Sequence, residues 1–311
     1  LQLTWAQPTD TSTSHQFFGQ WRSYYLGTFN QGDLSDFHGL ATGGKVGFRF
    51  SKGPWSVQTV GYTSANLNVQ DLRQPDAETG RLSRYELGLF DVNDPGRRLI
   101  VILGEAYLEY AVKGHMIKAG RMKFKSPLIN PQDGRMIPTL TQGATYKYVG
   151  ENKLTFQTTL LNAIATRSTD RFERIGDTIG LYPAGRNPDG SRSQYYGQTG
   201  TEFIWINHLG KSFGSSLKAN LWNYHVDKVF NTTYARLNWK PGKTLGVAVE
   251  GVHQRKVAHG GNEVDSLTYF FANSSTMVGT EISYHQGNQS VKIGYNHILA
   301  GGRFLFPREW G

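Results

Sequence analysis

The chain has 311 residues and carries 33 Lys and Arg against 24 Asp and Glu, a formal charge of +9. The cations are dispersed, and neither a basic run nor a nucleic-acid-binding motif accompanies them, which argues against a nucleic-acid partner and is compatible with a pore or cleft for anions. Hydrophobic residues reach only 38%, whereas aromatic residues reach 13% and Gly numbers 37, a composition poorly suited to a conventional globular core.

No segment of the chain is apolar enough to form a membrane-spanning helix. The longest aliphatic run, LIVIL at 99–103, is far shorter than the roughly 20 residues that such a helix needs. The first residues, LQLTWAQ, have neither a charged start nor an apolar signal core. We therefore expect any export signal to have been removed already.

Alternation of apolar and polar residues with period 2 dominates the chain. The first such segment places Phe17 and Trp21 on one face and Gln20 and Arg22 on the other. Several segments approach the 9 to 11 residues of a membrane-spanning strand. We predict about thirteen strands, at 15–30, 38–51, 54–66, 97–112, 115–125, 142–150, 153–166, 196–209, 212–226, 229–240, 243–256, 276–286 and 289–300.

The predicted connections alternate in length. Short turns are expected at 51–55, 112–115, 149–153, 209–212, 240–243 and 285–289, and longer loops at 66–97, 126–141, 167–195 and 256–275, with one brief turn near Asp227 on the long-loop side. This layout predicts an all-β fold, a transmembrane antiparallel up-and-down β-barrel in a bacterial outer membrane with its short turns in the periplasm. A soluble β-sandwich or propeller is the alternative, but its strands are usually shorter.

The predicted number of strands is odd, whereas single-chain bacterial barrels close with an even number. The chain also ends on FLFPREWG instead of an amphipathic strand. We therefore expect residues 1–311 to form a single outer-membrane barrel domain that lacks its C-terminal strands.

The stretch GRMKFK, residues 120–125, places three cations on one predicted strand face, opposite Met122 and Phe124. Burying three charges against lipid is costly, so we expect the cations to face the lumen. Glu105 and Glu109 on the preceding strand could pair with them and hold them extended across a pore. The alternative places the three cations as interfacial anchors at the strand end. They are Arg121, Lys123 and Lys125.

The loop that follows, 126–141, contains three prolines and an Asp-Gly turn, which predicts a stiff shape without sheet pairing. Folded inward, it would constrict the channel. Arg135 could then present its planar guanidinium to a carboxylate. The alternative is that Arg135 pairs with Asp133 and stabilises the turn.

Several segments together resemble one family. GRMKFKSPLINPQDGRMIPTLTQGA resembles the signature of the OprD family of substrate-specific outer-membrane channels. WRSYYLGTF and ATGGKVGFRF resemble its opening hairpin, YTSANL its third strand, and ANLWNYHVDKVFNTTYARLNW and GTEISYHQGNQSVKIGYNHILAGGRF its later hairpins. The resemblance runs in order from about residue 15 to residue 306.

The resemblance implies an 18-stranded monomeric barrel, constricted by inward-folded loops, with a ladder of basic side chains that guides carboxylate-bearing solutes. It places the constriction at Arg135 and Asp133. The chain ends some five strands early for such a barrel, and the loops 66–97 and 167–195 match no family pattern. The ladder would run through Arg121, Lys123 and Lys125, with Arg22, Arg49, Lys218 and Arg236 as further lumen cations.

The predicted function is passive, selective uptake of small carboxylate-bearing or zwitterionic solutes, with no cofactor or metal and with outer-membrane lipid around the barrel. One alternative is a barrel that serves as a scaffold or anchor, with a partner protein on the long loops. Another is an outer-membrane hydrolase. The sequence contains neither a G-x-S-x-G elbow nor an H-E-x-x-H zinc pair, which favours a non-enzyme.

Overall fold

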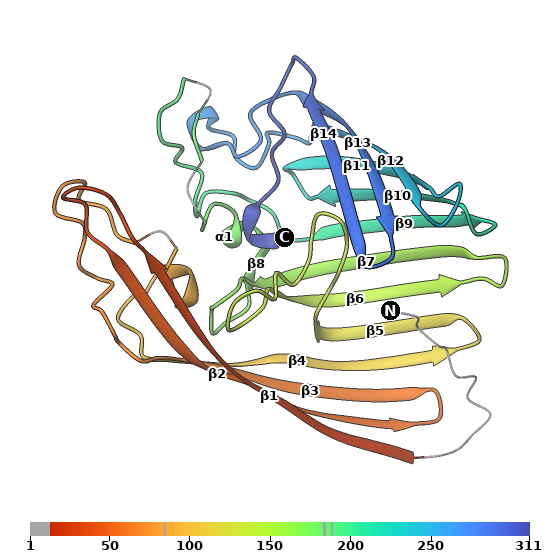
Figure 1. Ribbon diagram of the computed structural model, residues 1–311, viewed down its shortest axis with the longest axis horizontal. Helices are drawn as coiled ribbons and strands as arrows, with labels where there is room; N and C mark the ends of the chain where they lie inside the picture. The colour runs from red at the N-terminus through yellow and green to blue at the C-terminus, as the bar shows by residue number, and fades with distance from the viewer. Residues whose placement is uncertain (1–12, 84, 183–184, 188) are drawn as a thin grey trace.

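The computed structural model describes residues 13–83, 85–182, 185–187 and 189–311. These residues form one fourteen-stranded antiparallel sheet in which the long strands pair in chain order, and only the short β8 branches from this path by pairing with β7 (Figure 1). The strands are β1 (Thr13–Thr28), β2 (Phe37–Lys52), β3 (Trp55–Asn66), β4 (Leu99–Val112), β5 (His115–Met122), β6 (Leu140–Val149), β7 (Leu154–Ala165), β8 (Glu173–Arg174), β9 (Ile204–Phe213), β10 (Leu217–Val226), β11 (Phe230–Trp239), β12 (Leu245–Lys256), β13 (Ser274–Gln286) and β14 (Gln289–Ile298).

Helical structure in the described residues is limited to one short α-helix and three 3-10 turns. They are α1 (Ile175–Thr178), η1 (Leu87–Leu89), η2 (Asp265–Leu267) and η3 (Arg308–Trp310). Within the described part of the chain, no helix has the length and apolar character required to cross a membrane. The predicted all-β, up-and-down antiparallel architecture is therefore confirmed.

Several predicted boundaries are wrong, and the strand predicted from residue 196 begins only at Ile204, as β9. The hairpin between β9 and β10 turns at 214–216, where Gly214 adopts φ +62°, and the predicted turn at 209–212 is paired strand instead. Strand β5 ends at Met122 and not at residue 125. After Met122 the chain leaves the sheet, because Phe124 is buried in an apolar cluster and Pro127 cannot donate to a ladder.

The two faces of the sheet differ as those of a membrane barrel wall do. Large apolar side chains project from one face without protein cover; for example, Val46 on β2 is 73% exposed and Ile293 on β14 is 71% exposed. The other face is concave and carries the polar groups together with packed loop segments (Figure 1). Apolar residues outside and polar residues inside reverse the pattern of a sheet that faces water.

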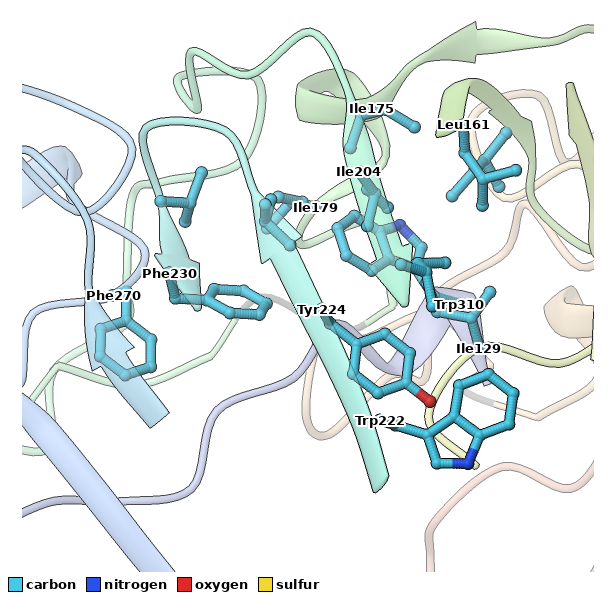
Figure 2. Packing of buried hydrophobic residues seen from close by; sticks show 14 of the residues in the cluster. Ile129, Leu161, Ile175, Ile179, Ile204, Trp222, Tyr224, Phe230, Phe270 and Trp310 are labelled. Atoms are coloured by element: carbon cyan, nitrogen blue, oxygen red, sulfur yellow. The ribbon is translucent and has the colours of Figure 1, made fainter. Parts of the chain in front are cut away.

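The segments inside the concave face are held by two apolar clusters. In the larger cluster, η3 inserts Trp310 among residues of α1, the following loop and strands β9 to β11 (Figure 2). The Trp310 indole Nε1 donates to Thr178 Oγ1 at 2.8 Å. Tyr224, Phe230 and Phe270 line the same cluster. These contacts fix the last residues of the chain against the interior of the sheet.

The long loops 66–97 and 167–195, which matched no pattern in the sequence, are tied to each other. Arg97 of the first loop forms an ion pair with Asp170 of the second loop at 2.7 Å. Arg97 also pairs with Asp91 of its own loop at 3.4 Å. The Ser168 hydroxyl also donates to the carbonyl of Gly88 at 3.2 Å. The two loops therefore form one structured layer on the long-loop side of the sheet.

A glycine permits close strand pairing beside the predicted ladder. Gly120 on β5 adopts φ +125°, and a Cβ at this position would lie 2.2 Å from the carbonyl oxygen of Ala106 on β4. Any side chain would therefore push β4 and β5 apart.

Candidate functional site

The first charged cluster joins the strand wall to the loop that follows β5. Asp133 accepts from Arg22 on β1 at 3.1 Å and from Lys123 at 2.9 Å. The Lys123 ammonium also lies 5.7 Å from the centre of the Tyr62 ring. Burial opposes ionisation of Asp133, but Lys123 and Arg22 hold its pKa below the ordinary value. The cluster therefore contains two cations and one ionised carboxylate.

Arg135 lies beside this cluster without pairing to its carboxylate. Among the described contacts, Asp133 binds Arg22 and Lys123, so the predicted alternative of an Arg135–Asp133 pair is wrong. The Arg135 carbonyl accepts from Arg22 Nη1 at 2.6 Å, and its guanidinium lies 5.7 Å from the centre of the Tyr24 ring. Its Nη1 is buried and has no hydrogen-bond partner. Arg135 is thus held by its backbone and retains a free donor.

The loop that bears these residues runs from 123 to 139, because β6 begins at Leu140 and the predicted range 126–141 includes its first two residues. Buried apolar side chains anchor the loop, with Ile129 in the larger cluster and Met136 and Ile137 in the smaller one. The backbone N–H of Asn130 donates to the backbone carbonyl of Trp310 at 2.8 Å. The loop is thus packed against segments on the concave side, and its role as a constriction stays a prediction.

A second cluster lies on β2, β4 and β5. Glu109 accepts from Arg49 at 2.9 Å and from Lys118 at 2.8 Å. The predicted pairing of this glutamate with the cations of residues 121–125 is therefore wrong. Lys118 was missed because its position opposite Glu109 depends on the register between β4 and β5, which alternation within one strand does not reveal.

Glu105 is also satisfied by its own neighbours on the sheet. Its two carboxylate oxygens accept from the Tyr62 hydroxyl at 2.6 Å and from Gln58 Nε2 at 3.0 Å. The described residues include no cation within ion-pair distance of Glu105, so its predicted pairing with the cations of residues 121–125 is wrong as well.

Three predicted ladder cations stand apart from these clusters. Arg121 donates to Gln142 Oε1 at 3.2 Å and to the carbonyl of Leu103 at 3.3 Å, and its guanidinium lies over the Phe172 ring. Lys125 is exposed beyond the end of β5, and Lys218 is exposed on β10. Neither lysine makes an ion pair within the described part of the chain. Their place in a ladder stays a prediction.

A third cluster lies on β11, β12 and β13. Arg236 pairs with Glu250 at 2.7 Å and with Glu281 at 3.5 Å, and the Tyr234 hydroxyl also donates to Glu250 at 2.7 Å. Both glutamates were missed in the sequence. Alternation could have found Glu250, because it follows the exposed Val249 and so belongs to the concave face.

A cavity on the long-loop side gathers cations from four separate segments. Its volume is about 520 Å³. No pattern in the sequence indicates this cavity, because the segments meet only after folding. Burial and the nearby Arg135 and Arg308 lower the pKa of Arg167, with Tyr182 opposing them. The five arginines that line it are Arg81, Arg135, Arg167, Arg192 and Arg308.

A buried carboxyl lies beside this cavity. The Oε1 atom of Glu309 accepts from the Tyr182 amide at 2.8 Å, and burial raises the pKa of Glu309 to about 7. No group of three or more His, Asp or Glu in the described ranges could hold a metal ion.

Comparison with known proteins identifies the family. Residues 109–308 match the model of the outer membrane porins of the OprD family, which is more than half of the chain. No curated protein matches the sequence. Among solved structures, the Pseudomonas aeruginosa protein OpdK, crystallised with vanillate, is similar with 17% sequence identity and a TM-score of 0.64, over 92% of this chain and 66% of OpdK.

Two further Pseudomonas aeruginosa structures are similar to this chain to the same degree. OccK2 (OpdF), in complex with glucuronate, has 13% identity and a TM-score of 0.64, over 92% of this chain and 64% of that protein. OccK8 (OprE) has 13% identity and a TM-score of 0.66, over 92% of this chain and 68% of that protein. This chain thus spans about two-thirds of the length of these neighbours. It belongs to the OprD family of outer membrane porins and is located in the bacterial outer membrane.

Proposed function

We propose that the protein is a channel for passive, selective uptake of small carboxylate-bearing or zwitterionic solutes, and not an enzyme. The observation that carries this proposal is the uneven pairing of charge on the concave face. On β1 to β5 and the adjoining loop, Asp133 and Glu109 are each shared by two cations. On β11 to β13, two glutamates share the single cation Arg236.

This arrangement suits passage of small ions better than tight binding. One part of the wall carries excess positive charge and another carries excess negative charge, so a zwitterion could align its two ends between them. The partly neutralised pairs hold their side chains extended and offer several weak sites in succession. Conduction needs such weak, repeated binding, because a tightly bound solute would block the pore.

The named ligands of the relatives support a carboxylate substrate. Vanillate and glucuronate, which accompany OpdK and OccK2, both carry a carboxylate group. Arginines present paired donors that fit a carboxylate. In this chain, Arg135 has a donor without a partner at the loop proposed to form the constriction. The exposed apolar face would contact the lipid of the outer membrane.

Single-channel conductance of the full-length protein in a planar bilayer tests the proposal. Small carboxylates and uncharged solutes of the same size are titrated against the open channel. We expect saturable block by the carboxylates and none by the uncharged solutes. A protein without any conductance would instead favour a plugged barrel or a scaffold for a partner, and equal effects of both kinds of solute would exclude selectivity for carboxylates.

A further inference from the structure

None of the ion-paired side chains of the strand wall lines the arginine cavity on the long-loop side, although Arg135 of the cavity lies beside Arg22. We call the arginines that line it the arginine pocket; they are Arg81, Arg135, Arg167, Arg192 and Arg308. They come from the loop after β3, the loop after β5, the loop after β7 and η3. Only tertiary packing brings them together, so their common position is not a by-product of one charged segment.

None of these five side chains is neutralised by an ion pair with a described carboxylate. In contrast, seven arginines elsewhere in the described residues form ion pairs with carboxylates. They are Arg22, Arg49, Arg73, Arg97, Arg171, Arg174 and Arg236. In the pocket, Arg135 Nη1 and Arg167 Nε are buried without a hydrogen-bond partner. Buried donors left unpaired are unfavourable, so the pocket is incomplete without an acceptor.

The walls between the arginines are apolar. Leu82, Leu87, Val92 and Leu181 line the cavity, and the Tyr182 ring lies under the Arg167 guanidinium at 5.1 Å. The volume of about 520 Å³ lies within the range of sites for small organic ligands. It therefore accommodates a carbon skeleton as well as its charged groups.

We infer that the arginine pocket is a docking site for solutes that carry two or more carboxylate groups, selected here before they reach the clusters of the strand wall. The inference rests on the proposed channel function and specifies its substrate class. A single carboxylate can engage one or two guanidinium groups and would leave the others without an acceptor. A di- or tricarboxylate can engage guanidinium groups on several segments at once.

Calorimetric titration of the detergent-solubilised full-length protein tests the inference independently of conductance. The probes are citrate, acetate and inorganic phosphate. We expect citrate to bind at least about tenfold more tightly than acetate, because it makes additional charge-assisted hydrogen bonds. The test variant is Arg192→Gln with Arg308→Gln, since both side chains are exposed and their loss leaves the apolar clusters intact.

The double variant should weaken citrate binding by about tenfold or more and leave acetate binding nearly unchanged. Arg174→Gln is the matched control, because Arg174 lies on β8, in the same connection between β7 and β9 as Arg167, but is exposed and paired with Asp177. It should bind citrate as the unaltered protein does. Equal affinity for citrate and acetate, or equal losses in the control and the double variant, would overturn the inference.

Tighter binding of phosphate than of citrate would also overturn the assignment to carboxylates. The proposed function fails on a different result, namely the absence of conductance in a planar bilayer. A channel that conducts and is blocked equally by acetate and citrate would retain the proposed function while excluding the inference.

Discussion

The two charged parts of the concave wall carry surplus charge of opposite sign. Near β1 to β5, Glu109 is shared by Arg49 and Lys118, whereas near β11 to β13 the single Arg236 is shared by Glu250 and Glu281. The net charge of +9 for the whole chain conceals this difference. Selectivity in such a wall depends on where each surplus lies, since a solute responds to the local field and not to the total charge.

Reversing the positive surplus should produce the largest effect. Replacing both Arg49 and Lys118 with Gln leaves Glu109 without its two cations and changes the net charge of the Glu109 cluster from positive to negative. We expect the permeability ratio of anions to cations to fall by about tenfold, as expected for the loss of two strong local charges. Reversal potentials in a salt gradient measure the ratio.

Arg255→Gln is the control for this double variant. Arg255 is exposed at the end of β12 and makes no ion pair within the described residues, so the variant removes a positive charge without altering any cluster. A similar fall in the control would show that total charge, and not its placement, sets selectivity.

Removing the negative surplus should have the opposite and smaller effect. Glu250→Gln together with Glu281→Gln leaves Arg236 as an unpaired cation on this part of the wall. We expect anion preference to rise by about threefold and block by zwitterions to weaken, because their ammonium end loses its partner. Reversal potentials and block by a neutral amino acid measure the two effects. Unchanged block by the zwitterion would exclude alignment across the wall.

On the long-loop side, the charge beside the arginine pocket depends on pH. Burial raises the pKa of Glu309 to about 7, and the groups that face it are Tyr182, Tyr269, Arg167 and Arg308. As the pH rises from 6 to 8, the carboxyl loses its proton and adds negative charge beside the arginine pocket. Carboxylate block should therefore weaken by about twofold to threefold over this range. Glu309→Gln should remove the pH dependence between these values.

The same carboxyl predicts the sign of a stability change. Its pKa is about 7 in the folded protein and 4.5 in its ordinary state, so between these values the folded protein retains a proton that the unfolded chain releases. The free energy of unfolding should therefore fall as the pH rises from about 4.5 to 7 and show no further loss from this group above that range. Denaturant titration of the unaltered protein and of Glu309→Gln measures the difference; similar pH profiles would exclude this role of Glu309.

Much of the wall was predictable, because period-2 alternation and glycine-containing turns are local features. The end of β5 was not, since residues MKFK continue the alternation of a strand after the chain has left the sheet. The pairing of Lys118 with Glu109 was also hidden, because it depends on the register between β4 and β5, which alternation within one strand does not reveal. The arginine pocket depends on contacts between distant segments, and no local pattern reports such contacts.

The smallest predicted effect concerns the cations at the end of β5. Lys123 pairs with Asp133 in the first charged cluster, whereas Arg121 is engaged by Gln142, the carbonyl of Leu103 and the Phe172 ring. Lys123→Gln should weaken carboxylate block by about twofold, because exposed or half-exposed charges act through a screened field. Arg121→Gln should change block less than this and act mainly on the contact with Phe172. Single-channel block by one carboxylate measures both variants under the same salt. A larger effect of Arg121→Gln would show that Arg121 lies in the solute pathway and that the ladder follows β5. Equal and negligible effects of the two variants would show that carboxylates are recognised at the strand clusters and the arginine pocket instead.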